Sequence, residues 1–267
     1  MKTLPSLIAV ALISSNTFAA TLDLQTTDYL PATNLQSSAA LALPTGLQTN
    51  ATVSYVDITG GSATQLQSVT INQDSNYSAY TNTTIEGDSN QVDIQQLGAS
   101  SAYANTDING FDNTLDLQQG DGSFAGGSYS AFIEQNASRG SIDLQQTGSG
   151  IAYAAIEQEL SANNSSVEIE QQTGLGEAYI QVVQGGTGNH TAVLQQLDGR
   201  LNEILLSQFG ANQTASILQL AGSNYAQVLQ DGANNEAYIT QGGGNDSRNA
   251  AYVTQLGSGN IVTITQR

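Results

Sequence analysis

Glutamine recurs at a fixed interval towards the end of the chain. The interval is 11 residues, and it separates Gln208, Gln219, Gln230 and Gln241 in succession before Gln255 and Gln266 repeat it. A primary amide carries two N–H donors and a carbonyl acceptor, so amides placed in register on stacked strands hydrogen-bond to one another along the stack. The chemistry that this spacing predicts is therefore the formation of side-chain ladders.

Each of these glutamines closes a short unit of the form Gln-x-Gly-x-x-Asn-x-Φ-x-Φ-x-Gln, in which Φ is alanine or a larger apolar residue. A clean copy is NNEAYITQ, where Asn235, Ala237, Ile239 and Gln241 are each two positions apart. In an extended strand such positions share one face, which we expect to point inward. The Gly, Ser, Asn and Asp residues between units favour tight turns. Each unit therefore predicts one strand and one turn.

The inward position recurs, with looser spacing, through most of the chain. Weaker copies at Asn82 and Asp107 fill two gaps. Each amide hydrogen bond contributes about 1 kcal/mol, so we expect stability to come from their number. The predicted self-assembly ladder comprises Gln73, Gln96, Gln119, Gln135, Gln146, Gln158, Gln171, Gln184, Gln196, Gln208, Gln219, Gln230, Gln241, Gln255, Gln266, Asn224, Asn235, Asn249 and Asn260.

Acidic residues fall on the other face of the predicted strands. They lie three positions before a glutamine at Asp93, Asp116, Asp143 and Glu168, and one position before it at Glu134, Glu157 and Glu170. Segments such as LDLQQ recur in every second strand, so the full repeat is two strands, or about 22 to 27 residues. In register, the first four acids form an outward column whose neighbours repel by roughly 1 kcal/mol in water. We hypothesise that protons or divalent cations relieve this repulsion and speed assembly.

A unit of two short strands cannot bury its inner face alone, so the units must stack. The predicted fold is all-β, with strand-turn-strand repeats stacked into a thin β-solenoid of cross-β, amyloid-like architecture. A hydrophobic share of 39% and a charged share of 10% fit a thin core better than a thick one. The segment IVTIT at 261–265 is a complete repeat strand, and we expect its open edge to accept another chain.

Residues for catalysis or metal binding are sparse. His190 is the one histidine and there is no cysteine, so we predict no catalytic residue, no cofactor and no metal site, and we expect His190 in or beside the turn after Asn189. Gly-rich calcium loops recur in some secreted solenoids, but GGGND at 242–246 has no second copy. A formal charge of −18 disfavours nucleic acid and anionic membranes as partners.

Tyrosine follows alanine at similar places in several units. Tyr153, Tyr179, Tyr238 and Tyr252 are examples. They form either outward rows that bind dyes, polysaccharide or other fibres, or packing contacts with a neighbouring turn. The second interpretation is the one we favour.

The beginning of the chain reads as an export signal. Lys2 precedes a mostly apolar stretch at 4–13, and Thr17-Phe18-Ala19 suits a cleavage site. We expect a signal peptide at 1–19, a non-repeat segment at 20–61 that serves export or anchoring, and a repeat domain at 62–267. No later segment approaches the roughly 20 apolar residues of a membrane helix.

These units resemble the curlin repeats of bacterial curli, which carry the pattern Gln-x-Gly-x-x-Asn-x-Ala-x-x-x-Gln in strand-turn-strand pairs. The resemblance covers about 68–267 and is close to literal at 219–241, and the tail at 259–267 is similar to that of the minor curlin subunit. This chain has more repeats, a more irregular first half and far more acidic residues than that subunit.

The resemblance implies an extracellular functional amyloid of the biofilm matrix that adheres to surfaces. It also implies delivery through an outer-membrane curli pore with accessory factors, partnership with itself and other curlin subunits, and a nucleating role if the minor subunit is the right relative. A monomeric secreted β-solenoid, acting as an adhesin or an ice- or surface-binding protein, remains the alternative. In either case we expect no enzyme activity.

Overall fold

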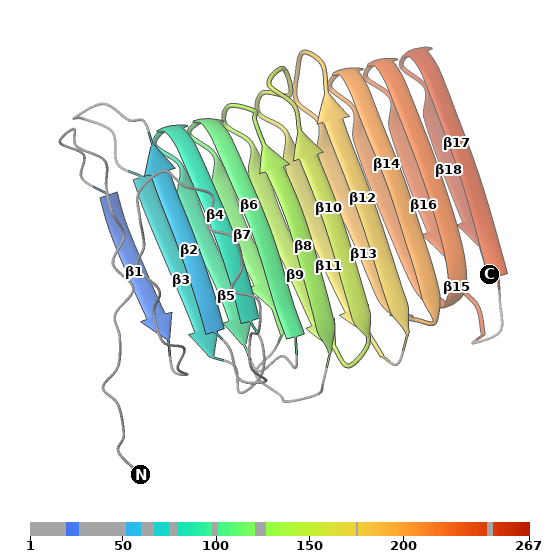
Figure 1. The fold of residues 1–267 in the computed structure, drawn as a ribbon. Helices are drawn as coiled ribbons and strands as arrows, with labels where there is room; N and C mark the ends of the chain where they lie inside the picture. Colours follow the sequence, from blue (N-terminus) through green and yellow to red (C-terminus); the bar gives the residue numbers. More distant parts are fainter. Residues whose placement is uncertain are drawn as a thin grey trace.

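The computed structural model describes residues 20–26, 52–59, 67–74, 79–97, 101–120, 127–174, 176–244 and 248–267. In these ranges the chain winds into a flattened coil with two β-sheets back to back (Figure 1). Each turn of the coil gives one strand to each sheet. β1 lies at one end of the stack, and β17 and β18 lie at the other.

Sheet 1 contains one strand from each coil, and all its strands are parallel. Its strands are β1 (Ala20–Thr26), β3 (Gln67–Asp74), β5 (Gln91–Leu97), β7 (Thr114–Gln119), β9 (Ser141–Gly148), β11 (Ser166–Thr173), β13 (Thr191–Gly199), the first part of β15 (Thr214–Ala233), β16 (Glu236–Gln241) and β18 (Ile261–Gln266).

Sheet 2 contains the other strand of each coil. Its strands are β2 (Thr52–Thr59), β4 (Ala79–Asp88), β6 (Ser101–Phe111), β8 (Ser128–Gln135), β10 (Ile151–Gln158), β12 (Glu177–Gly185), β14 (Leu201–Ala211), the second part of β15, and β17 (Arg248–Ser258). Strands in both sheets pair in register, so that equivalent residues of successive coils lie above one another.

The core is a single apolar layer between the two sheets. Inward positions alternate with outward ones along each strand, as in β10, where Ala152, Ala154, Ile156 and Gln158 are all buried. The buried cluster runs continuously from Val69 to Val253. The predicted all-β stacked-repeat fold is confirmed, because every element of the described residues is a strand. No helix long and apolar enough to cross a membrane occurs among the described residues.

Turns between the sheets rely on left-handed backbone conformations. Gly210 and Gly232 have φ of 106° and 127°, and a Cβ on either would collide with the carbonyl of the equivalent glycine in the next coil. Two residues after each of them, Asn212 and Asn234 have φ of 52° and 54°. Gly and Asn tolerate this region best, which explains why turns of this chain are rich in both.

The interval at 20–61, where we expected no repeat, contributes β1 and β2 to the stack. β1 pairs with β3 and β2 with β4, both in parallel. The rest of that interval and the expected signal peptide at 1–19 lie outside the described residues, so the boundaries proposed at 19 and 61 stay predictions.

Candidate assembly site

The glutamines of sheet 1 form one continuous ladder. Each side-chain amide donates from Nε2 to the Oε1 of the glutamine in the next coil, at distances between 2.6 and 3.1 Å. The ladder joins Gln73, Gln96, Gln119, Gln146, Gln171, Gln196, Gln219, Gln241 and Gln266. Neighbours in it are 22 to 27 residues apart, which confirms the predicted two-strand repeat.

Sheet 2 has a second ladder of the same kind but a shorter one. Its Nε2 to Oε1 distances are 2.8 to 2.9 Å. It joins Gln135, Gln158, Gln184, Gln208, Gln230 and Gln255. Every ladder glutamine in the sequence-based prediction thus lies in one of two columns within the chain.

In most ladder glutamines a second amide hydrogen ties the two sheets together. Gln119 Nε2 donates to the Tyr103 carbonyl and Gln230 Nε2 to the Thr214 carbonyl, in each case across the bend of the coil. Because only the NH₂ end of the amide can donate to a carbonyl, this contact fixes the orientation of the side chain. All ladder bonds therefore run in one direction, with donors facing the end at β17 and β18.

The ladder of sheet 2 begins abruptly at Gln135. Its Oε1 is buried and has no hydrogen-bond partner among the described residues. The equivalent position one coil earlier is Ile108, and Ile85 precedes it. The prediction that Asn82 and Asp107 fill these gaps was wrong, because the register puts isoleucine in the column and leaves Asp107 exposed on the outer face.

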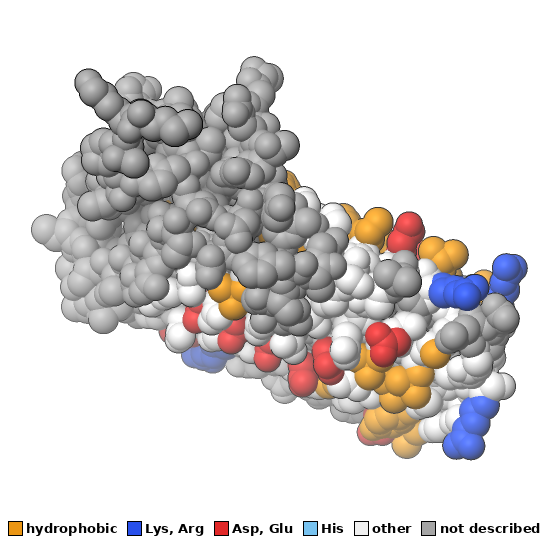
Figure 2. Space-filling view, turned by 90° about the horizontal axis from the view of Figure 1, so that it is seen from below, with side chains coloured by type: hydrophobic (Ala, Val, Ile, Leu, Met, Phe, Trp, Pro, Cys, Tyr) orange, Lys and Arg blue, Asp and Glu red, His pale blue; other side chains and the backbone are white. Residues whose placement is uncertain are grey.

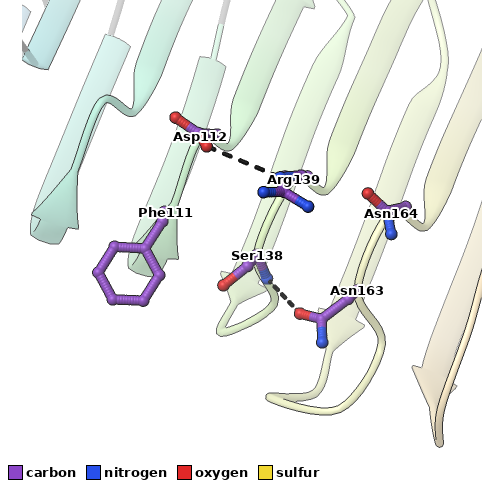
Figure 3. Close-up of a pocket in the computed structure, with 6 residues that line it drawn as sticks. All are labelled: Phe111, Asp112, Ser138, Arg139, Asn163 and Asn164. Atoms are coloured by element: carbon purple, nitrogen blue, oxygen red, sulfur yellow. Dashed lines mark hydrogen bonds and ion pairs between the residues drawn. The ribbon is translucent and has the colours of Figure 1, made fainter.

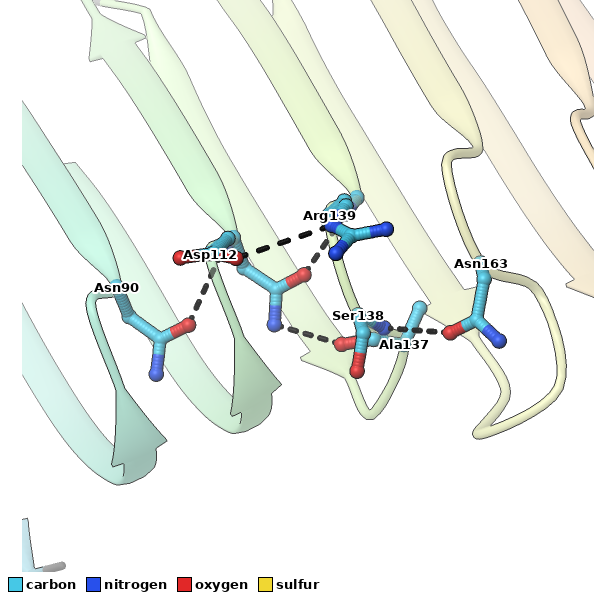
Figure 4. A network of polar contacts seen from close by, with 8 residues as sticks. Asn90, Asp112, Ala137, Ser138, Arg139 and Asn163 are labelled. Carbon is cyan, nitrogen blue, oxygen red and sulfur yellow. Dashed lines mark hydrogen bonds and ion pairs between the residues drawn. The ribbon is translucent and has the colours of Figure 1, made fainter. Parts of the chain in front are cut away.

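Asparagine forms a second polar column at the start of several strands. In sheet 1, Asn113 Nδ2 donates to the Ala137 carbonyl while its Oδ1 accepts from the backbone N–H of Gly140 (Figure 4). Asn235 and Asn260 make the corresponding contact further along, with Asn235 Oδ1 accepting from Asn260 N–H at 3.1 Å. These side chains replace strand pairing at the point where the chain turns.

In sheet 2 the asparagine column is confined to the last coils. Asn249 Nδ2 donates to Asn224 Oδ1 at 3.0 Å, and Asn224 Nδ2 donates to Asn202 Oδ1 at 3.2 Å. Sequence reasoning found Asn224, Asn235, Asn249 and Asn260 but missed Asn90, Asn113 and Asn202. The missing signal was simple, since each of these also lies six positions before a ladder glutamine.

His190 takes an asparagine position in sheet 1. It is fully buried and lies between the turn at 186–188 and the start of β13, so the expected place beside a turn is found, but that turn comes before Asn189 and not after it. Its backbone N–H donates to Ser165 Oγ. Burial lowers the pKa of the imidazole, and the nearby Gly185 backbone opposes this weakly although neither ring nitrogen reaches hydrogen-bond geometry. The imidazole ring thus fills this position as part of the buried interior.

The acidic columns stand on the outer faces as predicted. Asp93, Asp116, Asp143 and Glu168 are in register on sheet 1. Burial raises the pKa of Asp116, and the carboxylates of Asp143 and Asp93 raise it further. On sheet 2, burial raises the pKa of Asp107, helped by Glu134 and Glu86. No group of three metal-ligating side chains occurs in the described ranges.

Tyrosines stack on one another along sheet 2 instead of packing against turns. The rings of Tyr153 and Tyr179 are 5.0 Å apart and parallel within 1°, and those of Tyr80 and Tyr103 are 5.1 Å apart. Tyr238 lies on sheet 1, where its hydroxyl donates to Glu236. The favoured interpretation of these residues was therefore wrong for the stacked pairs.

The stack ends in an unprotected edge. β18 pairs with β16, and no described strand pairs with its other side. Its inward residues Val262 and Ile264 are only partly buried, whereas the equivalent residues of β16, Ala237 and Ile239, are fully covered. In Figure 2 the acidic side chains lie along the body of the stack, while arginine side chains gather at this end, where Arg248 and Arg267 belong.

Residues 210–243 match a family model described as the curlin associated repeat. The matched segment lies in β14, β15 and β16 and contains Gln219, Gln230 and Gln241 of the two ladders. No curated protein and no solved structure gives a match. The resemblance to curlin repeats is thereby confirmed for this segment, and the repeat and the solenoid fold together point to a structural protein.

Proposed function

We propose, from the curlin repeat that this chain carries, that it is an extracellular structural subunit of a curli-like functional amyloid. Its strand edge at β17 and β18 would template the next chain, and the fibre would serve adhesion in a biofilm matrix. Export by a signal peptide at 1–19 and passage through an outer-membrane pore belong to the same proposal. Self and other curlin subunits are the expected partners.

The ladders carry this proposal. Gln266 accepts from Gln241 and donates one amide hydrogen to the Ala250 carbonyl. Its second amide hydrogen has no acceptor among the described residues, although every earlier glutamine in the column uses that hydrogen to reach the next coil. A new strand that brings a glutamine Oε1 to this position would extend the ladder and pair the open edge of β18 at the same time.

The two ends of the stack do not match one another. At the β17–β18 end both columns finish in glutamine, at Gln266 and Gln255. Towards the other end the column of sheet 2 holds Ile108 and Ile85 before Gln135, so no glutamine ladder runs through those coils. The two ends of the sheet 2 column therefore present different residues to a neighbouring chain.

A partner whose first coil presents a glutamine in the sheet 1 column would extend that ladder at Gln266. In sheet 2, Gln255 already donates both amide hydrogens, to the Glu236 and Asn260 carbonyls. The difference between the two ends of the stack favours a nucleating role, in which the chain starts a fibre of another curlin subunit, over a role as the repeating unit. Repulsion points the same way, because the acidic columns lie in coils from Asp93 to Glu168, whereas Glu236 is the one acidic residue in β16 to β18.

The test is a thioflavin-T time course on the mature chain diluted from denaturant, alone and at low ratio in a tenfold or larger excess of a major curlin subunit. We expect a shortened lag for the major subunit, and fibre diffraction with reflections near 4.7 and 10 Å. A stable monomer that neither forms fibres nor shortens the lag would instead support the monomeric β-solenoid adhesin.

A further inference from the structure

A hollow opens on the turn edge of the stack where the repeat changes length. Five positions separate Gln135 from Gly140, but seven separate Gln158 from Ser165, so the second turn projects beyond the first. On the other side of the short turn, the side chain of Phe111 projects from the end of β6. The space between them measures about 440 Å³ (Figure 3).

Polar groups of three successive turns line the hollow together with one aromatic ring. The lining consists of Phe111, Asp112, Ser138, Arg139, Asn163 and Asn164. Its volume lies within the roughly 300–1,000 Å³ of small-ligand sites. Phe111 is 54% exposed, so its side chain is accessible from the solvent.

The lining is held in place by bonds between the coils (Figure 4). The backbone N–H of Ser138 donates to Asn163 Oδ1 at 3.1 Å, and the N–H of Asn164 donates to the Ser138 carbonyl at 3.0 Å. The N–H of Arg139 donates to the Phe111 carbonyl at 2.7 Å. Because Asn163 accepts through Oδ1, its NH₂ group is directed away from Ser138 and is the part that can donate to a ligand.

The charges of the hollow cancel. Arg139 Nε lies 3.8 Å from Asp112 Oδ2, so an anion would meet the aspartate and a cation would meet the arginine. What remains is a neutral surface with both donors and acceptors: guanidinium and amide N–H groups, a carboxylate and a serine hydroxyl. An uncharged ligand rich in hydroxyl groups suits such a surface better than a charged one.

The Phe111 ring also indicates which class of uncharged ligand fits the hollow. The face of a phenyl ring is electron-rich and apolar, and it packs against C–H groups that carry a slight positive charge. Sugar rings combine such C–H faces with hydroxyls that both donate and accept. We propose that the hollow between Phe111 and the turn at 159–164 is a binding site for a neutral saccharide, with Phe111 as the stacking platform.

Saturation-transfer NMR with three soluble probes tests this site: cellohexaose as the neutral probe, a galacturonate hexamer as the acidic one and a glucosamine hexamer as the basic one. Measurements on freshly diluted chain and on assembled material keep the result independent of polymerisation. We expect cellohexaose to bind with a millimolar dissociation constant and the charged probes to bind at least about tenfold more weakly, a difference of about 1.4 kcal/mol.

Variants with matched controls locate the binding. Phe111→Ala and Arg139→Asn should each weaken cellohexaose binding by about tenfold or more. Asparagine tolerates the positive φ of 57° at position 139, so the second variant should keep its fold. Phe132→Ala removes another exposed phenylalanine and Arg200→Asn another turn arginine, and neither should change the affinity.

A further variant tests whether the Asp112–Arg139 charge balance, and not the shape of the hollow alone, excludes charged ligands. Asp112→Asn leaves Arg139 without its counter-ion, so the galacturonate hexamer should gain affinity. The proposal is overturned if cellohexaose does not bind the unmodified chain, if Phe111→Ala binds it as well as Phe132→Ala does, or if a charged probe binds the unmodified chain best.

Discussion

Gln135 and Ile108 occupy the same inward position in successive coils of sheet 2, and the glutamine ladder of that sheet starts between them. The side-chain oxygen Oε1 of Gln135 is consequently buried without a hydrogen-bond donor among the described residues. A buried unsatisfied acceptor costs roughly 1–3 kcal/mol. At this column, the coils that contain Ile85 and Ile108 therefore make apolar contacts only. The coils from Gln135 onwards form the glutamine ladder.

Adding a glutamine at position 108 should recover part of this cost. In Ile108→Gln the new Nε2 can donate to Gln135 Oε1, which offsets part of the lost apolar burial. In the control Ile94→Gln, an equally buried isoleucine of sheet 1 outside either ladder, nothing offsets the loss. We expect Ile108→Gln to unfold at a higher urea concentration than Ile94→Gln, by about 1–2 kcal/mol in free energy of unfolding. Equal midpoints would contradict a missing ladder bond at Gln135.

Interrupting the ladder in its middle should be costly. Gln171→Leu deprives Gln146 Nε2 of its acceptor and Gln196 Oε1 of its donor, which should lower the free energy of unfolding by about 2–4 kcal/mol. Gln172→Leu is the matched control, because this adjacent glutamine is exposed on the other face of β11. Urea denaturation followed by far-UV circular dichroism measures both. A similar loss in the two variants would show that the ladder position has no special role.

The acidic columns should make the stack more stable at low pH. The folded pKa of Asp116 is raised by burial first and then by Asp143 and Asp93, so the folded state binds its proton more tightly than the unfolded chain does. This contribution is fully present below the ordinary value of 3.8 and is lost as the pH rises through the raised pKa.

Stability between pH 7 and pH 4 should therefore rise as acid is added, and Asp116→Asn should flatten the rise. Asp198, which is exposed near the end of β13 and outside the acidic columns, provides the control variant Asp198→Asn, which should leave the slope intact. Thermal unfolding across this pH range gives the measurement. If the stability of Asp116→Asn changed with pH in parallel with that of the unmodified chain, the acidic column would not be the cause of the pH dependence.

The contribution of His190 to stability should depend on pH in the opposite direction to that of Asp116. Burial lowers its folded pKa below the ordinary 6.5, so its contribution is present above pH 6.5 and is lost as the pH falls through the lowered value. His190→Asn restores the residue that Asn113 and Asn235 have at this position, and its Oδ1 can accept from the next coil. We expect a more stable chain at pH 5, measured by urea denaturation, with the difference shrinking at pH 8. A variant that is less stable at both pH values would show that the imidazole fills the site better than an amide.

Much of this arrangement could be read from the sequence because a ladder needs identical residues at identical positions. The spacing of Gln219, Gln230 and Gln241 fixes the strand period, and the position of Asp116 relative to Gln119 fixes which face is outward. The anchor on glutamine also explains the errors. Ile85 and Ile108 occupy the column in β4 and β6. A pattern based on polar anchors predicts Asn82 and Asp107 there instead, although both lie on the opposite face of their strands.

Other features had no signal in a one-dimensional pattern. The stacking of Tyr153 on Tyr179 depends on both lying five positions before a ladder glutamine of sheet 2, which becomes evident only when the two sheets are distinguished. The hollow beside Phe111 arises from a difference of two residues between neighbouring turns. The repeat spacing varies by several residues along the chain, so this difference does not stand out in the sequence. β1 and β2 have no glutamine at the ladder position of the strand register, since Gln25 of β1 pairs with Asn72 and not with Gln73.

Fibre elongation from the open edge of β18 is the most direct test of the central claim. Val262→Lys places a charge on the inward face of this strand, where a new coil would bury it, and Thr263→Lys places the same charge one residue away on the outward face. Seeding of a major curlin subunit, followed by thioflavin-T, compares the two. The account predicts that Val262→Lys abolishes seeding while Thr263→Lys seeds like the unmodified chain. Seeding by both variants at the unmodified rate would contradict it, because the edge would then not be the templating surface.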